Sequence, residues 1–169
     1  MTPSILDAPR YLGNDPTITL RRPLHSDAPK AYPILALWHQ KVLAPYGVTY
    51  DQASAAQTVQ HILDEGVVVM AESVTDGMVG FLAGIVLAWP VNRQQWIVLE
   101  QFFWYNRRFP QVVEPLWQAF ELDAQRRGAV AVVGGAMDAF NRDQMGVLYR
   151  RRGYVPLDHS YVKCLNPIA

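Results

Sequence analysis

The dipeptide Asp76-Gly77 lies between two β-prone runs, and it constrains the fold of this chain more than any other short segment. The first run covers residues 66–71 and the second covers residues 78–87, and both are almost entirely apolar. A tight turn between antiparallel strands needs positive φ angles, which Gly adopts without strain and Asp tolerates. The sequence therefore predicts a β-hairpin around residues 75–77.

A third β-prone run over residues 95–104 is apolar on both faces, which predicts a central strand. Apolar residues at helical spacing, together with capping residues, predict four helices. We expect helices over residues 26–42, 51–66, 110–127 and 141–152, and further strands over 17–21, 129–133, 154–156 and 160–165. These elements predict an α/β (α+β) fold, in which a mixed, mainly antiparallel sheet of six to seven strands is flanked by about four helices.

The length of 169 residues suits one domain with a sizeable core. Residues 1–16 hold three prolines and show no periodicity, so we expect an N-terminal arm before a single domain over residues 17–169. The one cysteine, Cys164, excludes an intrachain disulfide, and we interpret it as a buried core residue. The four histidines lack metal-ligand spacing, so no metal site is predicted.

The charge balance and the apolar runs limit the classes of partner. Fifteen basic residues meet fifteen acidic ones, and this balance argues against a nucleic-acid partner, which usually selects for a basic surplus. The longest apolar run, residues 81–90, is shorter than the ~18 residues that suggest a membrane span. The N-terminus lacks the pattern of a secretory signal. We therefore expect a cytoplasmic protein with no membrane partner.

Two segments near the C-terminus carry recognisable motifs. Residues 124–129 read Ala-Gln-Arg-Arg-Gly-Ala, and residues 148–154 read Leu-Tyr-Arg-Arg-Arg-Gly-Tyr. Together with the element order, they resemble the GNAT superfamily of N-acetyltransferases over residues 17–165, and most closely the GNAT-like proteins of tailed bacteriophages. The resemblance implies an acyl-coenzyme A-dependent N-acyltransferase, which transfers an acetyl group from acetyl-CoA directly to a primary amine of a small molecule or protein.

The resemblance also implies where acetyl-CoA binds. In this family the fourth and fifth strands diverge around the pantetheine arm, and a backbone N–H of the fourth strand polarises the thioester carbonyl. The matching positions here are Phe103, Trp104 and Tyr105.

In the same family, the pyrophosphate rests on N–H groups at the start of the third helix, which is a natural anion site. The matching segment holds these candidate residues: Arg107, Arg108, Gln111, Val112 and Val113. Gln111 and Val113 replace the two small residues of the family's loop, and Pro110 supplies no N–H. Arg107 and Arg108 precede a helix start, which a bound pyrophosphate would stabilise; the alternative is that both extend into solvent.

Glu100 and Tyr149 are the candidate catalytic residues. Glu100 is the only charged residue of the run 95–104, and burial would raise its pKa towards that of a general base. Its alternative role is a core glutamate paired with an arginine, or one facing solvent. Tyr149 matches the family tyrosine that protonates the departing coenzyme A sulfur, and its alternative role is packing beside Met145. Asn141 resembles a residue that contacts the coenzyme arm, and its alternative role is a helix cap.

The sequence leaves two functions open. The first is the N-acetyltransferase described above, and the second is a catalytically inactive GNAT-fold binding or structural module that has lost its phosphate loop. A nucleic-acid role for the arginine clusters at 107–108 and 150–152 is weaker, because the net charge is zero. Trp38, Tyr46 and Tyr50 flank the helices that form one wall of the acceptor site in this family. The acceptor amine and the oligomeric state, a homodimer included, stay open.

Overall fold

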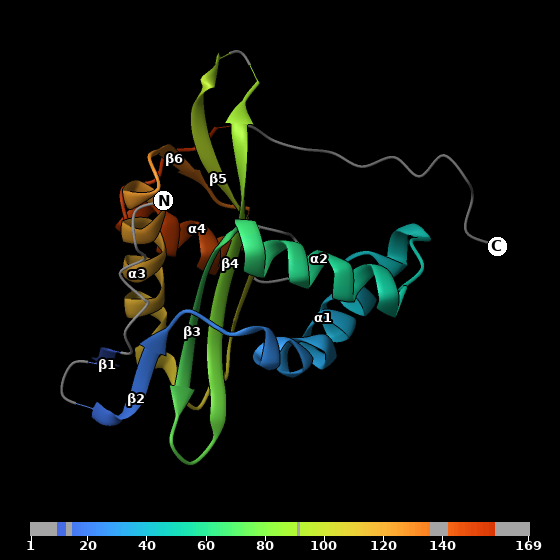
Figure 1. Ribbon diagram of the computed structural model, residues 1–169, viewed down its shortest axis with the longest axis vertical. Helices are drawn as coiled ribbons and strands as arrows, with labels where there is room; N and C mark the ends of the chain where they lie inside the picture. The colour runs from blue at the N-terminus through green and yellow to red at the C-terminus, as the bar shows by residue number, and fades with distance from the viewer. Residues whose placement is uncertain (1–9, 13–14, 91, 136–141, 158–169) are drawn as a thin grey trace.

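The computed structural model describes residues 10–12, 15–90, 92–135 and 142–157, and these form one six-stranded sheet with helices on both faces (Figure 1). The strands follow one another in the sheet in chain order, and all neighbours are antiparallel except β5 and β6, which are parallel. The strands are β1 (Arg10–Leu12), β2 (Asp15–Arg21), β3 (Val67–Ser73), β4 (Gly77–Trp89), β5 (Asn92–Tyr105) and β6 (Ala129–Val133). The helices are α1 (Ala28–Val42), α2 (Gln52–Glu65), α3 (Val113–Arg126) and α4 (Arg142–Arg151). The predicted mixed, mainly antiparallel fold is confirmed.

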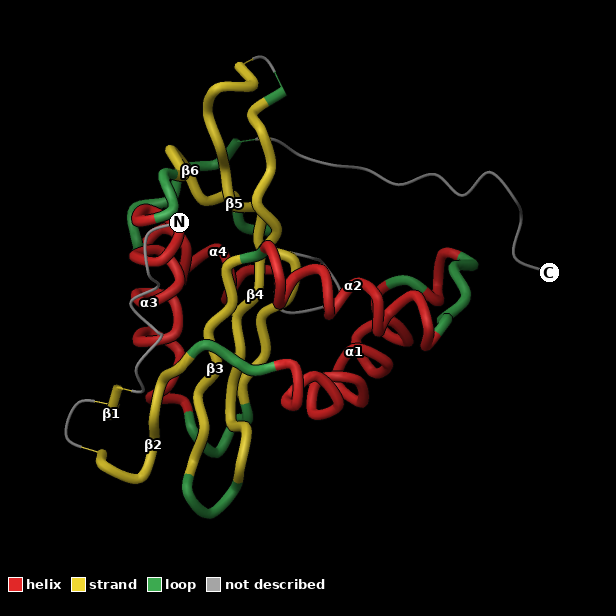
Figure 2. The backbone as a smooth tube through the Cα atoms, viewed as in Figure 1, coloured by secondary structure: helices red, strands yellow, loops and turns green. Residues whose placement is uncertain are grey.

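Different helices cover the two faces of the sheet, with α1 and α2 on one side and α3 on the other (Figure 2). On the α3 face, Trp117 and Phe120 pack in a buried cluster that contains Leu82 of β4. On the opposite face, Ile62 of α2 packs with Ala83, the next residue of β4. Alternation of side chains along the strand explains how consecutive residues reach different helices.

The predicted hairpin forms between β3 and β4. β3 ends at Ser73 and β4 begins at Gly77, so three residues connect the strands instead of a two-residue turn. Gly77, the first residue of β4, has a φ of 68°, a left-handed conformation that glycine adopts without strain. The Ser73 hydroxyl accepts the N–H of Thr75 at 3.3 Å and thereby stabilises the turn.

Two segments differ from the sequence expectation, and a proline lies inside an expected helix. Arg10–Leu12, inside the expected arm, forms β1 and pairs with β2, which buries Leu12. Pro33 lies inside α1, where its side chain is exposed and only one N–H donor is lost. Residues 154–157 form no strand, whereas the expected strand 160–165 and Cys164 lie outside the described residues.

Two aspartates precede helices and make different contacts. Asp51 caps α2 as predicted, since its carboxylate accepts the N–H of Ser54 at 2.7 Å. Asp27 precedes α1 but makes no side-chain cap to it. Its carboxylate instead accepts hydrogen bonds from the guanidinium of Arg21 at 2.7 and 3.1 Å, and from the N–H of Leu24 at 2.8 Å.

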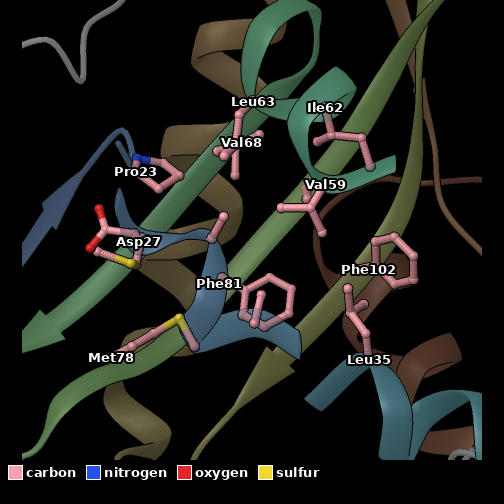
Figure 3. Close-up of a pocket in the computed structure, with 14 residues that line it drawn as sticks. Pro23, Asp27, Leu35, Val59, Ile62, Leu63, Val68, Met78, Phe81 and Phe102 are labelled. Atoms are coloured by element: carbon pink, nitrogen blue, oxygen red, sulfur yellow. The ribbon is translucent and has the colours of Figure 1, made fainter. Parts of the chain in front are cut away.

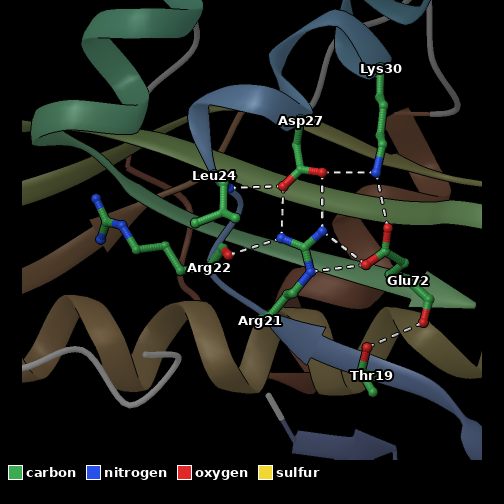
Figure 4. A network of polar contacts seen from close by, with 7 residues as sticks. All are labelled: Thr19, Arg21, Arg22, Leu24, Asp27, Lys30 and Glu72. Atoms are coloured by element: carbon green, nitrogen blue, oxygen red, sulfur yellow. Dashed lines mark hydrogen bonds and ion pairs between the residues drawn. The ribbon is translucent and has the colours of Figure 1, made fainter. Parts of the chain in front are cut away.

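Asp27 belongs to a network of two acids and two bases that joins the start of α1 to β2 and β3 (Figure 4). Lys30 lies 2.8 Å from Asp27 and 3.0 Å from Glu72, and Arg21 lies 2.8 Å from Glu72. The hydrogen bonds from Arg21 are the largest cause that lowers the pKa of Asp27. Because the Asp27 side chain is only 8% exposed, Arg21 is the partner that keeps its charge stable inside the protein.

We predict that Arg21→Met lowers the free energy of unfolding by about 3 kcal/mol at pH 7, because it leaves a buried carboxylate without its main partner. Lys30→Met is the matched control: the Lys30 side chain is 42% exposed and its loss leaves Arg21 on Asp27, so it should cost less than about 1 kcal/mol. Urea denaturation followed by circular dichroism measures both values. Equal losses in the two variants would contradict this assignment.

Candidate active site

The candidate site lies where β5 and β6 separate. Their pairing ends at Leu99 and Val133, whereas β5 continues to Tyr105 and the chain leaves β6 through Gly134 and Gly135. Beyond Leu99, the edge of β5 that faces away from β4 has no partner strand within the described ranges. Such an edge presents backbone N–H and C=O groups to which an extended ligand can hydrogen-bond.

One extra residue in β5 decides where its side chains point. Ala83 of β4 pairs with Phe102, but the next residue, Gly84, pairs with Glu100, so Gln101 is an extra residue of β5. In a regular strand, Glu100 and Phe102 would share a face. Instead, Phe102 lies with Ala83 on the face of α1 and α2, and Glu100 lies opposite Gly84 on the face of α3 and α4.

Glu100 and Tyr149, the two predicted catalytic residues, are in direct contact. The Tyr149 hydroxyl lies 2.9 Å from Glu100 Oε2 and 3.0 Å from the carbonyl oxygen of Gly135. The N–H of Gly135 donates to the same carboxyl oxygen at 3.1 Å. Among the residues that the structure describes, the partners of Glu100 are thus a phenol and a backbone amide, and no arginine pairs with it there. Groups from β5, α4 and the segment after β6 therefore meet at the separation of the strands.

Close packing holds the Tyr149 ring in this position. A Cβ at Gly134 would lie 2.5 Å from a ring carbon of Tyr149, so only glycine fits there. Trp117 meets the ring edge-on at a centroid distance of 5.4 Å, and Tyr154 packs at 5.2 Å. Tyr149 is 8% exposed. Tyr149 therefore packs in the core against Trp117 and Tyr154, and this packing directs its hydroxyl to Glu100.

Burial changes the acid–base properties of both groups. The pKa of Glu100 is raised above its ordinary 4.5, mainly because burial removes water from the carboxylate, and hydrogen bonds from Gly135 and Tyr149 oppose this. The pKa of Tyr149 is also raised, first by burial and then by the charge of Glu100. If Glu100 is protonated, its O–H can donate to the phenol oxygen while the phenol donates to Gly135. Both shifts therefore favour the neutral forms of Glu100 and Tyr149 relative to the same groups in water.

The aromatic residues after Glu100 lie on both faces of β5. Phe103 and Tyr105 stack at a centroid distance of 5.7 Å, and Phe103 also meets Trp117 at 5.6 Å. Trp104 packs instead against Phe81 at 6.1 Å. All three candidate residues are half-buried and their side chains serve packing. Their predicted contribution, a backbone N–H that polarises the thioester carbonyl of acetyl-CoA, stays a prediction.

The predicted phosphate loop uses several of its own N–H groups. Those of Val112 and Val113 donate to carbonyl groups three residues earlier, in a 3-10 turn over Pro110–Val112 that precedes α3. The N–H of Arg108 donates to the side chain of Asn106 at 3.0 Å, and Pro110 has no N–H. An anion at this helix start would therefore compete with hydrogen bonds that already exist.

The polar side chains of the loop face solvent. The exposed candidates are Arg107, Arg108 and Gln111. Arg108 also lies 3.1 Å from Asp76 of the β3–β4 turn. Glu114, whose charge would repel a phosphate, is paired with Arg152. An anion here would therefore be met chiefly by arginine side chains, and less by the backbone.

Three further residues frame the site and were not among the candidates predicted from the sequence. Gly134 and Gly135 follow β6, and this pair of glycines was the available signal; it lacks the G-x-G-x-x-G spacing of a dinucleotide-binding motif, so no role could be assigned to it from the sequence. Phe102 gave no signal, because an extra residue in a strand leaves no mark in a run that is apolar on both faces. Asn141 lies outside the described residues, so both of its roles stay predictions.

The aromatic residues expected near the acceptor differ in exposure. Trp38 packs edge-on against Phe102 at a centroid distance of 5.3 Å, whereas Tyr46 and Tyr50 are exposed. In the part of the chain that the structure describes, no helix is long and apolar enough to cross a membrane. Those same residues contain no group of three or more His, Cys, Asp or Glu side chains that could hold a metal ion.

Solved N-acetyltransferases share this fold. A ribosomal-protein-alanine N-acetyltransferase from Brucella melitensis matches with a TM-score of 0.66 and 19% identity, over 87% of this chain and 98% of that one. A glucosamine-6-phosphate N-acetyltransferase from Arabidopsis thaliana matches with a TM-score of 0.65 and 14% identity, over 89% and 99%. An aminoglycoside acetyltransferase from an uncultured soil metagenomic sample, in complex with sisomicin, gives 0.60 and 14%, over 90% and 97%. No family model and no curated protein sequence matches this chain.

These comparisons concern architecture. At identities below 20% they show the fold alone, and the proteins named above differ in the acceptors that their names give. The six-stranded, mostly antiparallel sheet with its four helices is the GNAT fold.

The raised pKa of Glu100 predicts how stability depends on pH. Between its ordinary pKa near 4.5 and its raised value, the folded protein binds one proton more than the unfolded chain, so stability falls as pH rises through this interval. Glu100→Gln removes this loss, and its advantage over the wild type should grow by up to about 1.4 kcal/mol per pH unit. Urea midpoints from pH 4.5 to 8 measure the difference. Asp143→Asn, at an exposed side chain of α4, is the control and should show no such trend; a flat difference for Glu100→Gln would refute the assignment.

Proposed function

We propose that this chain is an acyl-coenzyme A-dependent N-acyltransferase, which transfers an acetyl group to a primary amine in a ternary complex. The observation that carries the proposal is the contact between the Tyr149 hydroxyl and the Glu100 carboxyl where β5 and β6 separate. The acetyltransferase fold supports the proposal at the level of architecture. The phage-encoded subgroup and the cytoplasmic location stay predictions.

The arrangement of the strands suggests where acetyl-CoA would lie. The unpaired edge of β5 beyond Leu99 offers backbone groups to the amides of the pantetheine arm. A backbone N–H near Phe103 to Tyr105 would polarise the thioester carbonyl. The phosphates would lie near Arg107 and Arg108, whose side chains supply the positive charge that the loop backbone supplies only in part.

The proposed reaction is a direct transfer. The amine nitrogen forms a bond to the thioester carbonyl carbon, the carbon–sulfur bond breaks, and the sulfur takes the proton of the Tyr149 hydroxyl. Tyr149 then regains a proton from Glu100, at 2.9 Å, and Glu100 in turn takes the proton that the amine releases, directly or through water. One proton thus passes from the amine to the sulfur, and both residues return to their starting states.

A specific observation favours the second candidate, an inactive binding or structural module. The N–H groups of Val112 and Val113 are used inside the 3-10 turn, and Val112 is fully buried in the core. In a protein that does not bind coenzyme A, this loop would be free to pack into the core, as it does here. Binding of acetyl-CoA therefore separates the two functions.

Calorimetric titration with acetyl-CoA should show micromolar binding by the wild type. Arg108→Glu should weaken this binding at least ~10-fold, or about 1.4 kcal/mol, because it reverses a charge beside the phosphates. Arg93→Glu, at an exposed residue of β5 far along the strand from this loop, should change it less than about twofold. Lack of binding by the wild type at millimolar acetyl-CoA would reject the enzyme and leave the module.

Tyr149→Phe should lower kcat by about 100-fold or more and leave KM for acetyl-CoA unchanged, since it removes the proton donor without removing the ring. Tyr154→Phe is the matched control, because Tyr154 packs against Tyr149 but its hydroxyl bonds Glu121 at 3.0 Å. Release of free thiol, in the presence of lysine, glucosamine or 2-phenylethylamine, measures the rate. Equal rates in the Tyr149→Phe variant and the wild type would exclude Tyr149 as the acid.

A further inference from the structure

A hollow lies between the helix pair α1–α2 and the sheet (Figure 3). It is on the face of the sheet opposite to the one where Glu100 contacts Tyr149. Its empty volume is about 490 Å³, a figure that includes the solvent at its open mouth, so it is an apolar hollow and not a closed cavity. Leu35 of α1 and Val59 of α2 form one side, and Met78, Phe81 and Phe102 of the strands form the other. The pocket thus shares strand β5 with the candidate site, while its helices are different ones.

The lining determines which chemical group can enter. Thirteen of the fourteen lining residues are apolar, and the exception is Asp27. The Asp27 carboxylate is already engaged by Arg21, Lys30 and the N–H of Leu24. A charged or strongly polar group would lose its hydration here without gaining a free partner, whereas an aliphatic or aromatic group would gain from leaving water. Methionine side chains adapt to different shapes and suit such a site.

Phe102 links the pocket to the candidate active site. The extra residue Gln101 turns the Phe102 side chain into the pocket, while Glu100, two residues away, faces Tyr149. The unpaired edge of β5, where the thioester is proposed to lie, therefore runs beside the pocket. A molecule with its apolar part in the pocket would have its polar end close to this edge.

We infer that the pocket receives the apolar part of the acceptor, which is a primary amine that carries an aliphatic or aromatic group. This inference rests on the proposed acyl transfer. It adds a substrate class that neither the fold nor the contact of Glu100 with Tyr149 specifies. The helices that line the pocket, α1 and α2, lie on the other face of the sheet and make no part of that contact.

Binding of two probes tests the pocket separately from catalysis. 2-Phenylethanol is apolar but cannot be N-acylated, and ethanolamine is an amine without an apolar group. Calorimetry should detect 2-phenylethanol and not ethanolamine, with or without acetyl-CoA. Ala31→Leu fills the pocket and should weaken binding of 2-phenylethanol at least ~10-fold, since it removes the space that an aromatic ring would occupy. Ala36→Leu, on the same helix and half-buried but not in the lining, should leave binding unchanged.

A second variant keeps the test valid if Ala31→Leu does not fold. Leu35→Ala enlarges the pocket and should improve binding of the larger 2-(1-naphthyl)ethanol relative to 2-phenylethanol. Failure of the wild type to bind 2-phenylethanol, or equal binding by the Ala31→Leu variant, would overturn the inference.

Rates of acetyl transfer then distinguish an error in the assignment of the pocket from an error in the proposed reaction. Faster transfer to 2-phenylethylamine than to ethanolamine, lost in the Ala31→Leu variant, is the expected result. Equal transfer to both amines would leave the acyltransferase standing and reject the apolar acceptor. Binding of 2-phenylethanol by a protein that does not bind acetyl-CoA would reject the reaction, and with it the assignment of the pocket to an acceptor.

Discussion

The register shift between β4 and β5 determines the arrangement of everything else in the candidate site. Because Gln101 is one residue too many for regular pairing, Glu100 and Phe102 lie on opposite faces of the sheet although they are two residues apart. Glu100 reaches the hydroxyl of Tyr149 on one face, and Phe102 enters the apolar pocket on the other. A regular strand would bury both side chains on the same side and would separate the acid–base pair or close the pocket. Strand β5 therefore contributes one side chain to the acid–base pair and another to the apolar pocket.

Small residues make this arrangement sterically possible. Gly84 lies opposite Glu100, and a Cβ there would lie 2.8 Å from side-chain atoms of Phe120 and 2.9 Å from the Leu99 carbonyl oxygen. Gly134 similarly gives its space to the ring of Tyr149. At both positions the reason for glycine is close approach of a neighbour, and not an unusual backbone angle. These glycines let α3 and α4 approach the sheet closely enough to hold the phenol beside the carboxyl group.

Local patterns in the sequence predicted the elements, whereas the site depends on contacts between distant segments. The Asp76-Gly77 hairpin could be predicted because turn chemistry and strand periodicity act within a few residues. The β1 strand could not, because three residues carry no periodic signal and only pairing with β2 stabilises them. Glu100 and Tyr149 were each selected as a single candidate. Their contact across 49 residues depends on the extra residue in β5 and on the ring packing of Trp117, which no local pattern encodes.

The phosphate loop shows how a change in packing alters a binding site. A Cβ at Gly80 would lie 3.2 Å from a methyl carbon of Val112, so the start of α3 is packed tightly against β4. Val112 fills this space, and it belongs to a turn whose N–H groups donate to carbonyl groups of the same turn. Burial of the valine side chain stabilises the core, but these N–H groups are no longer free to bind an anion. Affinity for a phosphate then depends on the exposed Arg107 and Arg108, whose attraction salt screens far more than that of N–H groups at a helix start. A coenzyme A site of this kind would bind more weakly and with a steeper dependence on ionic strength than one with a glycine-rich loop. The contact of Glu100 with Tyr149, which lies inside the protein, would keep its geometry under the same conditions.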